Sequence, residues 1–167
     1  MDTSITSHTQ LYTLIGNPVS HSISPVIQNS IFAAKQFCNS KYIPLNVVPG
    51  EFDESILLLK QNFKGLNVTI PHKQTVMKHL DDIDEKALLC GAVNTVKNDN
   101  GRLIGYNTDG YGFMKAFDCL NIYMGHKDVL LIGAGGAARA VLCELLQRDC
   151  RVTIINRTQE RALRLQQ

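Results

Sequence analysis

Hydroxyl groups gather at one short motif near the N-terminus. Ser22 and Ser24 are separated by one residue, so in an extended segment their side chains point to the same side. Ser24 also precedes Pro25 at the start of a predicted helix, which predicts Ser24 as the N-cap. Unpaired N–H groups and the positive end of a helix suit a small carboxylate. The motif is a candidate anion site, although a serine in this position is more often only a cap.

A second motif combines an amide, a hydroxyl and an amine. Asn67 and Thr69 share one face of a predicted strand, and polar side chains on a buried strand need partners, which a ligand could provide. Lys73 lies two residues after Pro71, in the predicted first turn of a helix, where the helix dipole disfavours a cation. A lysine biased toward its neutral form suits a general base better than a solubilising role.

A glycine-rich turn follows the apolar run 129–132 and opens a predicted helix. It reads GAGGAA, the G-x-G-x-x-A variant of the dinucleotide fingerprint. Gly133 allows a tight turn, Gly135 lets a pyrophosphate approach the backbone, and Ala138 lets helix and strand pack closely. A plain strand–helix turn is the alternative, but a second strand follows at the expected spacing. The candidate cofactor-binding residues are Gly133, Ala134, Gly135, Gly136, Ala137 and Ala138.

The end of that second strand favours NADP. Chains that bind NAD usually carry Asp or Glu there for the ribose 2′-hydroxyl, whereas a guanidinium suits a 2′-phosphate. This chain has no acid at that point and reads Asn156, Arg157 and Thr158, with Arg161 one helical turn further on. A basic helix start that merely faces water is the weaker alternative, because cations oppose the dipole at a helix N-terminus.

Asn94 and Asp109 lie at matching ends of a predicted hairpin, so both could come near the mouth of one cleft. Asp109 could hold Lys73 in place and accept a hydroxyl of the substrate. Carboxylate recognition, hydroxyl recognition and a Lys/Asp acid–base pair beside an NADP site indicate hydride transfer between NADP and a secondary alcohol. No metal is expected, because no cysteine forms a C-x-x-C pair or has a histidine at ligand spacing.

The elements that must position these residues alternate between strand and helix, which indicates the α/β class. Pro44 suggests an edge strand, and the Asn100-Gly101 step predicts a hairpin. Strands are predicted at 11–15, 42–48, 65–70, 92–97, 102–106, 129–132 and 152–156, and helices at 24–38, 52–63, 109–120, from 135 and from 158. We expect an α/β substrate domain with a mixed sheet over 1–110. The first strand–helix–strand part of a Rossmann NADP-binding domain should follow over 111–167.

Composition fits a globular chain, with 44% hydrophobic residues and a formal net charge of +2 in 167 residues. That charge is too small to indicate a nucleic acid or an anionic membrane as partner. The N-terminus does not read as a secretory signal, and five cysteines without pairing spacing read as reduced thiols, so a cytoplasmic location is expected.

Several blocks together resemble the shikimate dehydrogenases. They are GNPVSHSISP at 16–25, NVTIPHK at 67–73, GAVNT at 91–95, GYNTDG at 105–110, and the two cofactor segments at 133–138 and 156–158. The resemblance runs from about residue 11 to the C-terminus. One minor departure is Gln28, where the family commonly has His.

This resemblance implies NADP-dependent reversible reduction of 3-dehydroshikimate to shikimate, in the pathway to chorismate and the aromatic amino acids. It implies that Ser22 and Ser24 bind the carboxylate, and that Lys73 shuttles the proton, paired with Asp109. Asn67, Asn94 and Asp109 would hold the ring hydroxyls, with Thr69 beside them. The expected partner is the small-molecule substrate, and the expected assembly is a monomer or homodimer.

The family's cofactor domain continues through more strands and returns a helix to the first domain, whereas this chain ends at Gln167. The resemblance therefore implies a C-terminally truncated chain. Two alternatives stay open: a quinate/shikimate dehydrogenase, and a non-catalytic module that binds shikimate.

Overall fold

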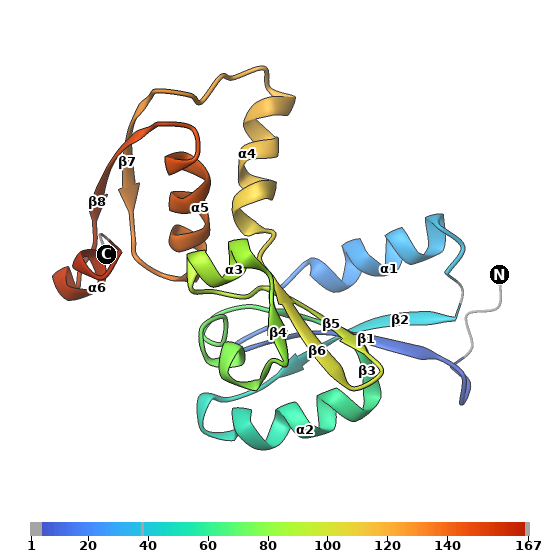
Figure 1. The fold of residues 1–167 in the computed structure, drawn as a ribbon. Helices are drawn as coiled ribbons and strands as arrows, with labels where there is room; N and C mark the ends of the chain where they lie inside the picture. Colours follow the sequence, from blue (N-terminus) through green and yellow to red (C-terminus); the bar gives the residue numbers. More distant parts are fainter. Residues whose placement is uncertain (1–4, 38, 166–167) are drawn as a thin grey trace. The chain divides into compact units, whose positions relative to one another are not determined.

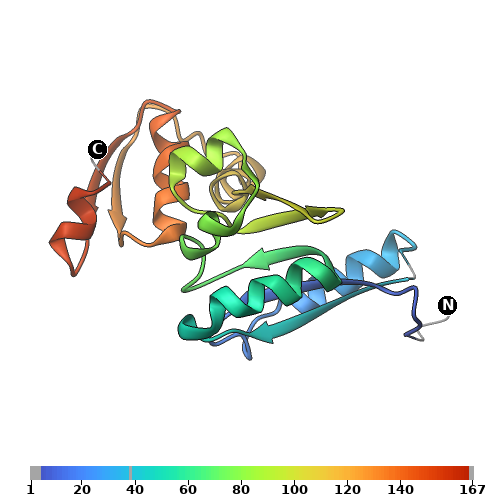
Figure 2. The same cartoon turned by 60° about the horizontal axis from the view of Figure 1, so that its bottom comes forward.

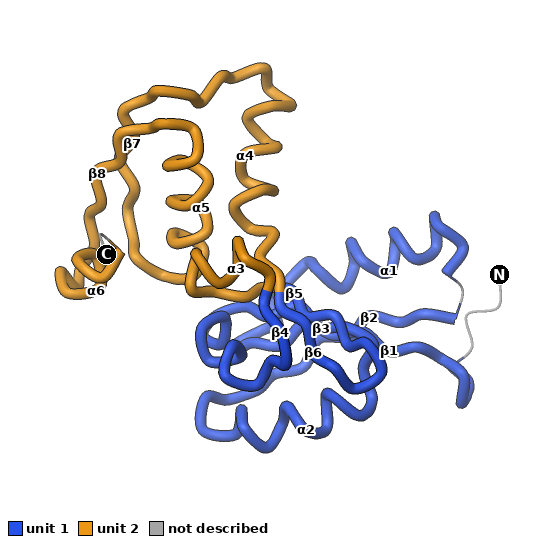
Figure 3. The backbone as a smooth tube through the Cα atoms, in the orientation of Figure 1, with its two compact units in different colours: residues 1–83, 95–105 blue, residues 84–94, 106–167 orange. Residues whose placement is uncertain are grey.

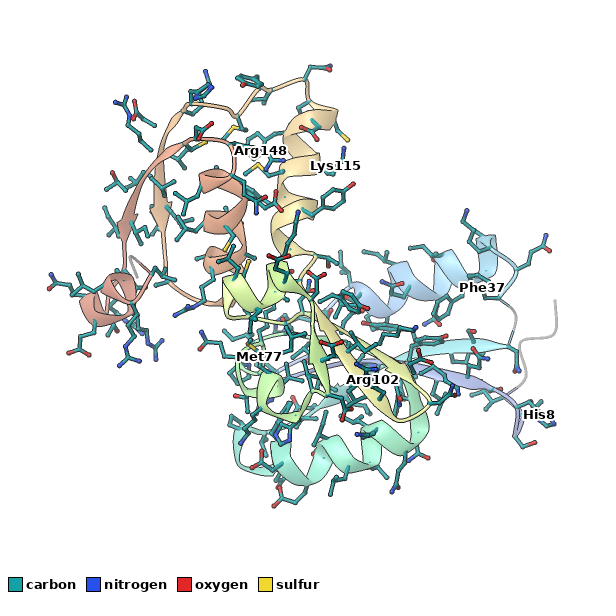
Figure 4. All side chains as sticks on the ribbon, viewed as in Figure 1. His8, Phe37, Met77, Arg102, Lys115 and Arg148 are labelled. Atoms are coloured by element: carbon teal, nitrogen blue, oxygen red, sulfur yellow. The ribbon has the colours of Figure 1, made fainter. Side chains whose placement is uncertain are left out.

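The computed structural model describes residues 5–37 and 39–165, and it divides into two compact units (Figure 3). Unit 1 comprises residues 1–83 and 95–105, and unit 2 comprises residues 84–94 and 106–167. The division of the chain into a substrate domain over 1–110 and a cofactor domain over 111–167 concerns function, and it stays a prediction.

Unit 1 is built on a six-stranded sheet in the order β2-β1-β3-β5-β6-β4 (Figure 1). Its strands are β1 (Gln10–Gly16), β2 (Ser40–Asn46), β3 (Phe63–Val68), β4 (Asp82–Ile83), β5 (Thr95–Asp99) and β6 (Arg102–Tyr106). β1 pairs in parallel with β2 and β3, whereas β3 and β5 are antiparallel, so the predicted mixed sheet is confirmed. Pro44 lies in β2 at the sheet edge, as predicted, where its missing N–H costs no ladder bond.

Two helices cover the two faces of this sheet, α1 (Ser24–Ala34) between β1 and β2 and α2 (Phe52–Asn62) between β2 and β3. The crossover from β1 to β2 and the crossover from β2 to β3 run in opposite directions across the sheet, so right-handed connections place the two helices on opposite faces (Figures 1 and 2). α2 buries Phe52, Ile56 and Leu59 at helical spacing, and β3 begins directly after it with buried Phe63. Two short 3₁₀ helices complete the unit, η1 (Pro49–Glu51) and η2 (Thr75–His79).

The predicted hairpin between β5 and β6 is confirmed. Asn100 and Gly101 have φ of 53° and 93°, the left-handed conformations that an Asn-Gly turn supplies cheaply. The Asn98 side chain fixes the turn by accepting from the Gly101 N–H at 2.8 Å, and its Nδ2 donates to the carbonyls of Lys60 and Phe63. The first strand of the hairpin starts at Thr95 rather than at residue 92.

Unit 2 contains α3 (Glu85–Cys90), α4 (Asp109–Cys119), β7 (Asp128–Ile132), α5 (Gly136–Leu146), β8 (Arg151–Ile155) and α6 (Gln159–Leu163). β7 and β8 are parallel, which confirms the predicted strand–helix–strand unit. α5 packs on both α3 and α4. The packing against α4 is close because a Cβ placed on Gly110 would lie 2.3 Å from the Ala140 carbonyl oxygen. Met114, Leu145 and Cys150 form the core.

Three predictions about helices were wrong. α1 begins at Ser24, so its N-cap is Ile23, with φ and ψ of −86° and −6°, and not Ser24 as predicted. α1 ends at Ala34, and Gln36 just beyond has a φ of 59°; the predicted end at Cys38 lies outside the described residues. Pro71 does not open a helix, because residues 70–74 form turns and the next helical segment begins at Thr75.

Within the described residues, no helix has the length and apolar character needed to cross a bilayer.

Candidate functional site

The two serines of the first motif lie side by side at the start of α1. The Ser22 hydroxyl donates to the Ser24 Oγ at 3.2 Å, and the Ser22 Oγ also accepts from the Ser24 backbone N–H at 3.2 Å. The hydroxyl that satisfies a backbone donor at the helix start therefore comes from Ser22. Both side chains are half-buried. The predicted pair of neighbouring hydroxyls is therefore present where α1 begins, beside the unpaired N–H groups of the helix start.

Asn67, near the end of β3, is held by two neighbours within unit 1. The Tyr42 hydroxyl donates to the Asn67 Oδ1 at 2.7 Å, and the Asn67 Nδ2 donates to the Thr95 Oγ1 at 3.2 Å. Tyr42 is 4% exposed, and burial raises the pKa of its phenol, so it remains a hydrogen-bond donor at neutral pH. These contacts fix the orientation of the Asn67 amide. Sequence reasoning missed Tyr42.

Thr69 follows β3 and packs against the end of β1. Its N–H donates to the Ile15 carbonyl at 2.9 Å. A Cβ on Gly16 would lie 2.4 Å from the Thr69 Cγ2, so only glycine at position 16 permits this approach. The polar end of β3 is thereby held beside the end of β1, as expected where neighbouring parallel strands finish at one sheet edge.

Lys73 lies in the turn over residues 70–74, half-buried, and not in the first turn of a helix. No helix begins at Lys73, so the predicted effect of a helix dipole on the Lys73 amine does not apply. The turn is anchored by its neighbour His72, which is 1% exposed. The ring N–H of His72 donates to the Val47 carbonyl at 2.6 Å, and the ring lies 4.6 Å from that of Phe52. His72 belongs to the NVTIPHK block, but its polarity alone gave no sign of this anchoring role.

Asn94 and Asp109 are brought together in unit 2. The Asn94 Nδ2 donates to the Asp109 Oδ1 at 2.7 Å and to the Thr108 Oγ1 at 2.9 Å. The Asn94 Oδ1 accepts from the Thr108 N–H at 3.0 Å. Asn107 completes the cluster by accepting from the Asp109 N–H at 3.0 Å and donating to the Ala92 carbonyl. The predicted proximity of Asn94 and Asp109 is therefore present, whereas the pairing of Asp109 with Lys73 stays a prediction.

The glycine loop between β7 and α5 has the geometry of a phosphate cradle. Gly133 has a φ of +115°, and Gly135 is the N-cap of α5. A Cβ on either glycine would meet no atom within 4 Å, so the backbone faces open space on that side. Helix N–H groups at this end suit an anionic group, and the loop therefore fits a pyrophosphate. The remaining positions of the fingerprint are Ala134, Gly136, Ala137 and Ala138.

The basic segment after β8 lies next to this loop. The Gly133 N–H donates to the Ile155 carbonyl at 2.7 Å, which places residue 156 beside the fingerprint. The Asn156 Nδ2 donates to the Thr158 carbonyl at 2.7 Å and tightens the turn into α6, of which Thr158 is the N-cap. Arg157 and Arg161 are exposed, so their guanidinium groups are accessible to a phosphate. The segment fits a cofactor with a charged adenosine end.

Two family models match the chain. The one described as the shikimate dehydrogenase substrate binding domain matches residues 14–96, and the one described as shikimate / quinate 5-dehydrogenase matches residues 116–167. A curated relative from Alkaliphilus oremlandii, a shikimate dehydrogenase (NADP(+)), is 43% identical over 162 residues. The match covers 95% of this chain and 56% of that relative, so the chain spans little more than half its length.

Solved structures agree with these matches. Shikimate dehydrogenase from Aquifex aeolicus has a TM-score of 0.92 and 41% identity, over 97% of this chain and 61% of the other. Shikimate 5-dehydrogenase from Thermus thermophilus, solved with NADP(H) and shikimate, has a TM-score of 0.86 and 34% identity, over 94% of this chain and 59% of the other. The motifs, the fold and both family models agree, and the chain belongs to the shikimate dehydrogenase family.

Proposed function

We propose that the chain carries the shikimate-binding residues and the adenosine-binding part of an NADP-dependent shikimate dehydrogenase, which reversibly reduces 3-dehydroshikimate to shikimate. The observation that carries most weight is the cluster in which Asn94 binds Asp109 at 2.7 Å, because it joins two separate family blocks into one polar group. The relatives named for this reaction, and the solved relative with NADP(H) and shikimate, support the same assignment.

The proposed binding roles follow the chemistry of each group. Ser22 and Ser24 present hydroxyls at a helix N-terminus, which suits the substrate carboxylate. Asn67, with its amide fixed by Tyr42, contacts a ring hydroxyl beside Thr69. Asn94 and Asp109 hold further hydroxyls; the Asp109 carboxylate can only accept, so it selects a donor on the ligand.

The proposed chemistry is a proton transfer by Lys73. NADPH, when bound, supplies the hydride. Lys73 gives a proton to the oxygen of the carbonyl being reduced and takes it back in the reverse direction, with Asp109 as its acid–base partner. Gly133 to Ala138 cradle the pyrophosphate, and Arg157, with Asn156, Thr158 and Arg161 around it, binds the 2′-phosphate.

The test uses a chimera in which the part of the Alkaliphilus oremlandii relative beyond the matched region follows this chain. NADPH oxidation with 3-dehydroshikimate should occur, with a lower kcat/KM for NADH. No oxidation by a folded chimera would refute the proposal. Quinate oxidation as efficient as shikimate oxidation would instead assign the quinate/shikimate branch. Measuring shikimate binding and turnover on the 167-residue chain alone distinguishes a binding module, which would bind without turnover.

A further inference from the structure

Two cysteines from different helices line one small pocket of unit 2. Cys90 is the last residue of α3, and Cys143 lies in the third turn of α5, the helix on which α3 packs. Lys86, Glu144 and Gln147 line the same pocket. Cys90 is 7% exposed, whereas Cys143 is half-buried. The two cysteine side chains therefore line the same pocket, and they lie close enough to share a hydrogen bond.

The surroundings of the two thiols differ, and this difference determines which thiol reacts first with an oxidant. Burial, together with a hydrogen bond to Cys143, raises the pKa of Cys90 to about 12. Cys90 is therefore a neutral thiol at physiological pH and a poor first target, because oxidants react with thiolates. Cys143 is the more exposed of the two residues, so a small oxidant that enters the pocket should react with Cys143 first.

We propose that Cys90 and Cys143 form a modification site, an intramolecular disulfide made on exposure to a small peroxide. Cys143 first reacts with hydrogen peroxide; its sulfur gains one oxygen and becomes a sulfenic acid, and one water leaves. The Cys90 thiol then gives up its proton as its sulfur attacks the sulfenic sulfur. The Cys90–Cys143 S–S bond forms, the S–O bond breaks, and a second water carries away the oxygen and that proton. The peroxide is reduced, both thiols are oxidised, and a thiol reductant reverses the bond.

The bond would join two helices whose ends lead to proposed binding residues. α3 ends in the Gly91 turn that leads to Asn94, and α5 begins at the glycine loop. A Cys90–Cys143 bond would tie these two helices together covalently. Because α3 already packs on α5, the bond should lock the existing arrangement and stabilise unit 2 rather than disrupt it.

Two other described cysteines of unit 2 provide matched controls. Cys150 is buried, and its S–H donates to the Met124 carbonyl at 2.8 Å. Cys119 is exposed at the end of α4, where an oxidant can reach it freely. If reactivity followed exposure alone, Cys119 would be modified first and Cys90 would stay reduced.

The experiment treats the purified, fully reduced 167-residue chain with hydrogen peroxide and maps its peptides by mass spectrometry after blocking the remaining thiols. We expect a peptide pair joined through Cys90 and Cys143, lighter by two hydrogen atoms, that disappears after reduction. Cys143→Ser and Cys90→Ser should each abolish it, while Cys119→Ser and Cys150→Ser leave its yield unchanged. Thermal unfolding should show a higher Tm for the oxidised wild-type chain.

Wild-type mapping needs no variant, so a variant that fails to fold does not weaken the test. Oxidation confined to Cys119, a disulfide between two chains on a non-reducing gel, or a Cys143 sulfinic acid with Cys90 still reduced would each overturn the proposal. This site is independent of the proposed dehydrogenase reaction, because its readout is a covalent bond and not turnover.

Discussion

The Tyr42 hydroxyl donates a 2.7 Å hydrogen bond to the Asn67 Oδ1, although the two residues lie on strands that do not pair with each other. β2 and β3 flank β1 on opposite sides; Tyr42 pairs with Tyr12 and Asn67 with Leu14. The tyrosine therefore reaches across β1 to orient an amide proposed to bind substrate.

Tyr42→Phe should weaken shikimate binding about two- to tenfold, because it removes the hydrogen bond that fixes the Asn67 amide. The measurement is the Kd of shikimate for the purified chain. Tyr12→Phe is the matched control, since the Tyr12 hydroxyl donates to the Gln10 Oε1 at 3.3 Å in an exposed position. An equal effect of both substitutions would show that the Tyr42 hydroxyl does not act through Asn67.

Lys73→Ala in the chimera should lower turnover by about 10²–10⁴-fold, the usual contribution of a general acid–base group, with little change in KM for the substrate. Lys78→Ala is the control, because Lys78 lies five residues away and forms a surface ion pair with Asp53 at 3.0 Å. A turnover of Lys73→Ala within twofold of the parent would remove Lys73 from the mechanism.

Arg157→Ala should weaken NADP binding about tenfold or more and leave NAD binding nearly unchanged, because a guanidinium that reads the 2′-phosphate has no partner on NAD. Both Kd values are measured on the chimera. Arg164→Ala, at another exposed arginine further along the same segment, should affect neither cofactor. Equal losses for both cofactors at Arg157 would contradict the proposed contact.

Gly110→Ala should destabilise the chain by about 1–3 kcal/mol, because the added methyl meets the Ala140 carbonyl across the α4–α5 contact. Gly112 lies two residues further along the same helix, and a Cβ placed on it would meet no atom within 4 Å. Gly112→Ala should stabilise the chain by about 0.5–1 kcal/mol through helix propensity. Urea unfolding measures the free energy of unfolding of both variants. A change in the same direction for both would refute the close approach of α4 to α5 at Gly110.

Local patterns predicted most of the fold. The Asn100-Gly101 turn, the period of α2 and the β7–α5–β8 unit each depend on residues close in sequence, and all three are present. The Tyr42–Asn67 contact could not be predicted in this way, because it depends on the strand order across 25 residues of chain.

The errors lie where tertiary contacts override local preference. Pro71 reads as a helix start, but the neighbouring His72 is anchored to the Val47 carbonyl and donates its backbone N–H to Thr69. These contacts hold residues 70–74 in turns, and the helical segment therefore begins only at Thr75. The candidate residues themselves were identifiable because Ser22 with Ser24, and Asn94 with Asp109, sit in short polar motifs at element ends.

The most direct test of this account is titration calorimetry of the 167-residue chain with shikimate. We predict saturable binding that Asn67→Ala and Asn94→Ala each weaken, while Asn62→Ala, at an exposed asparagine at the end of α2, leaves it unchanged. Absence of any saturable heat from a chain whose circular dichroism shows it folded, or binding insensitive to Asn67 and Asn94, would contradict the assignment of these residues to a shikimate site.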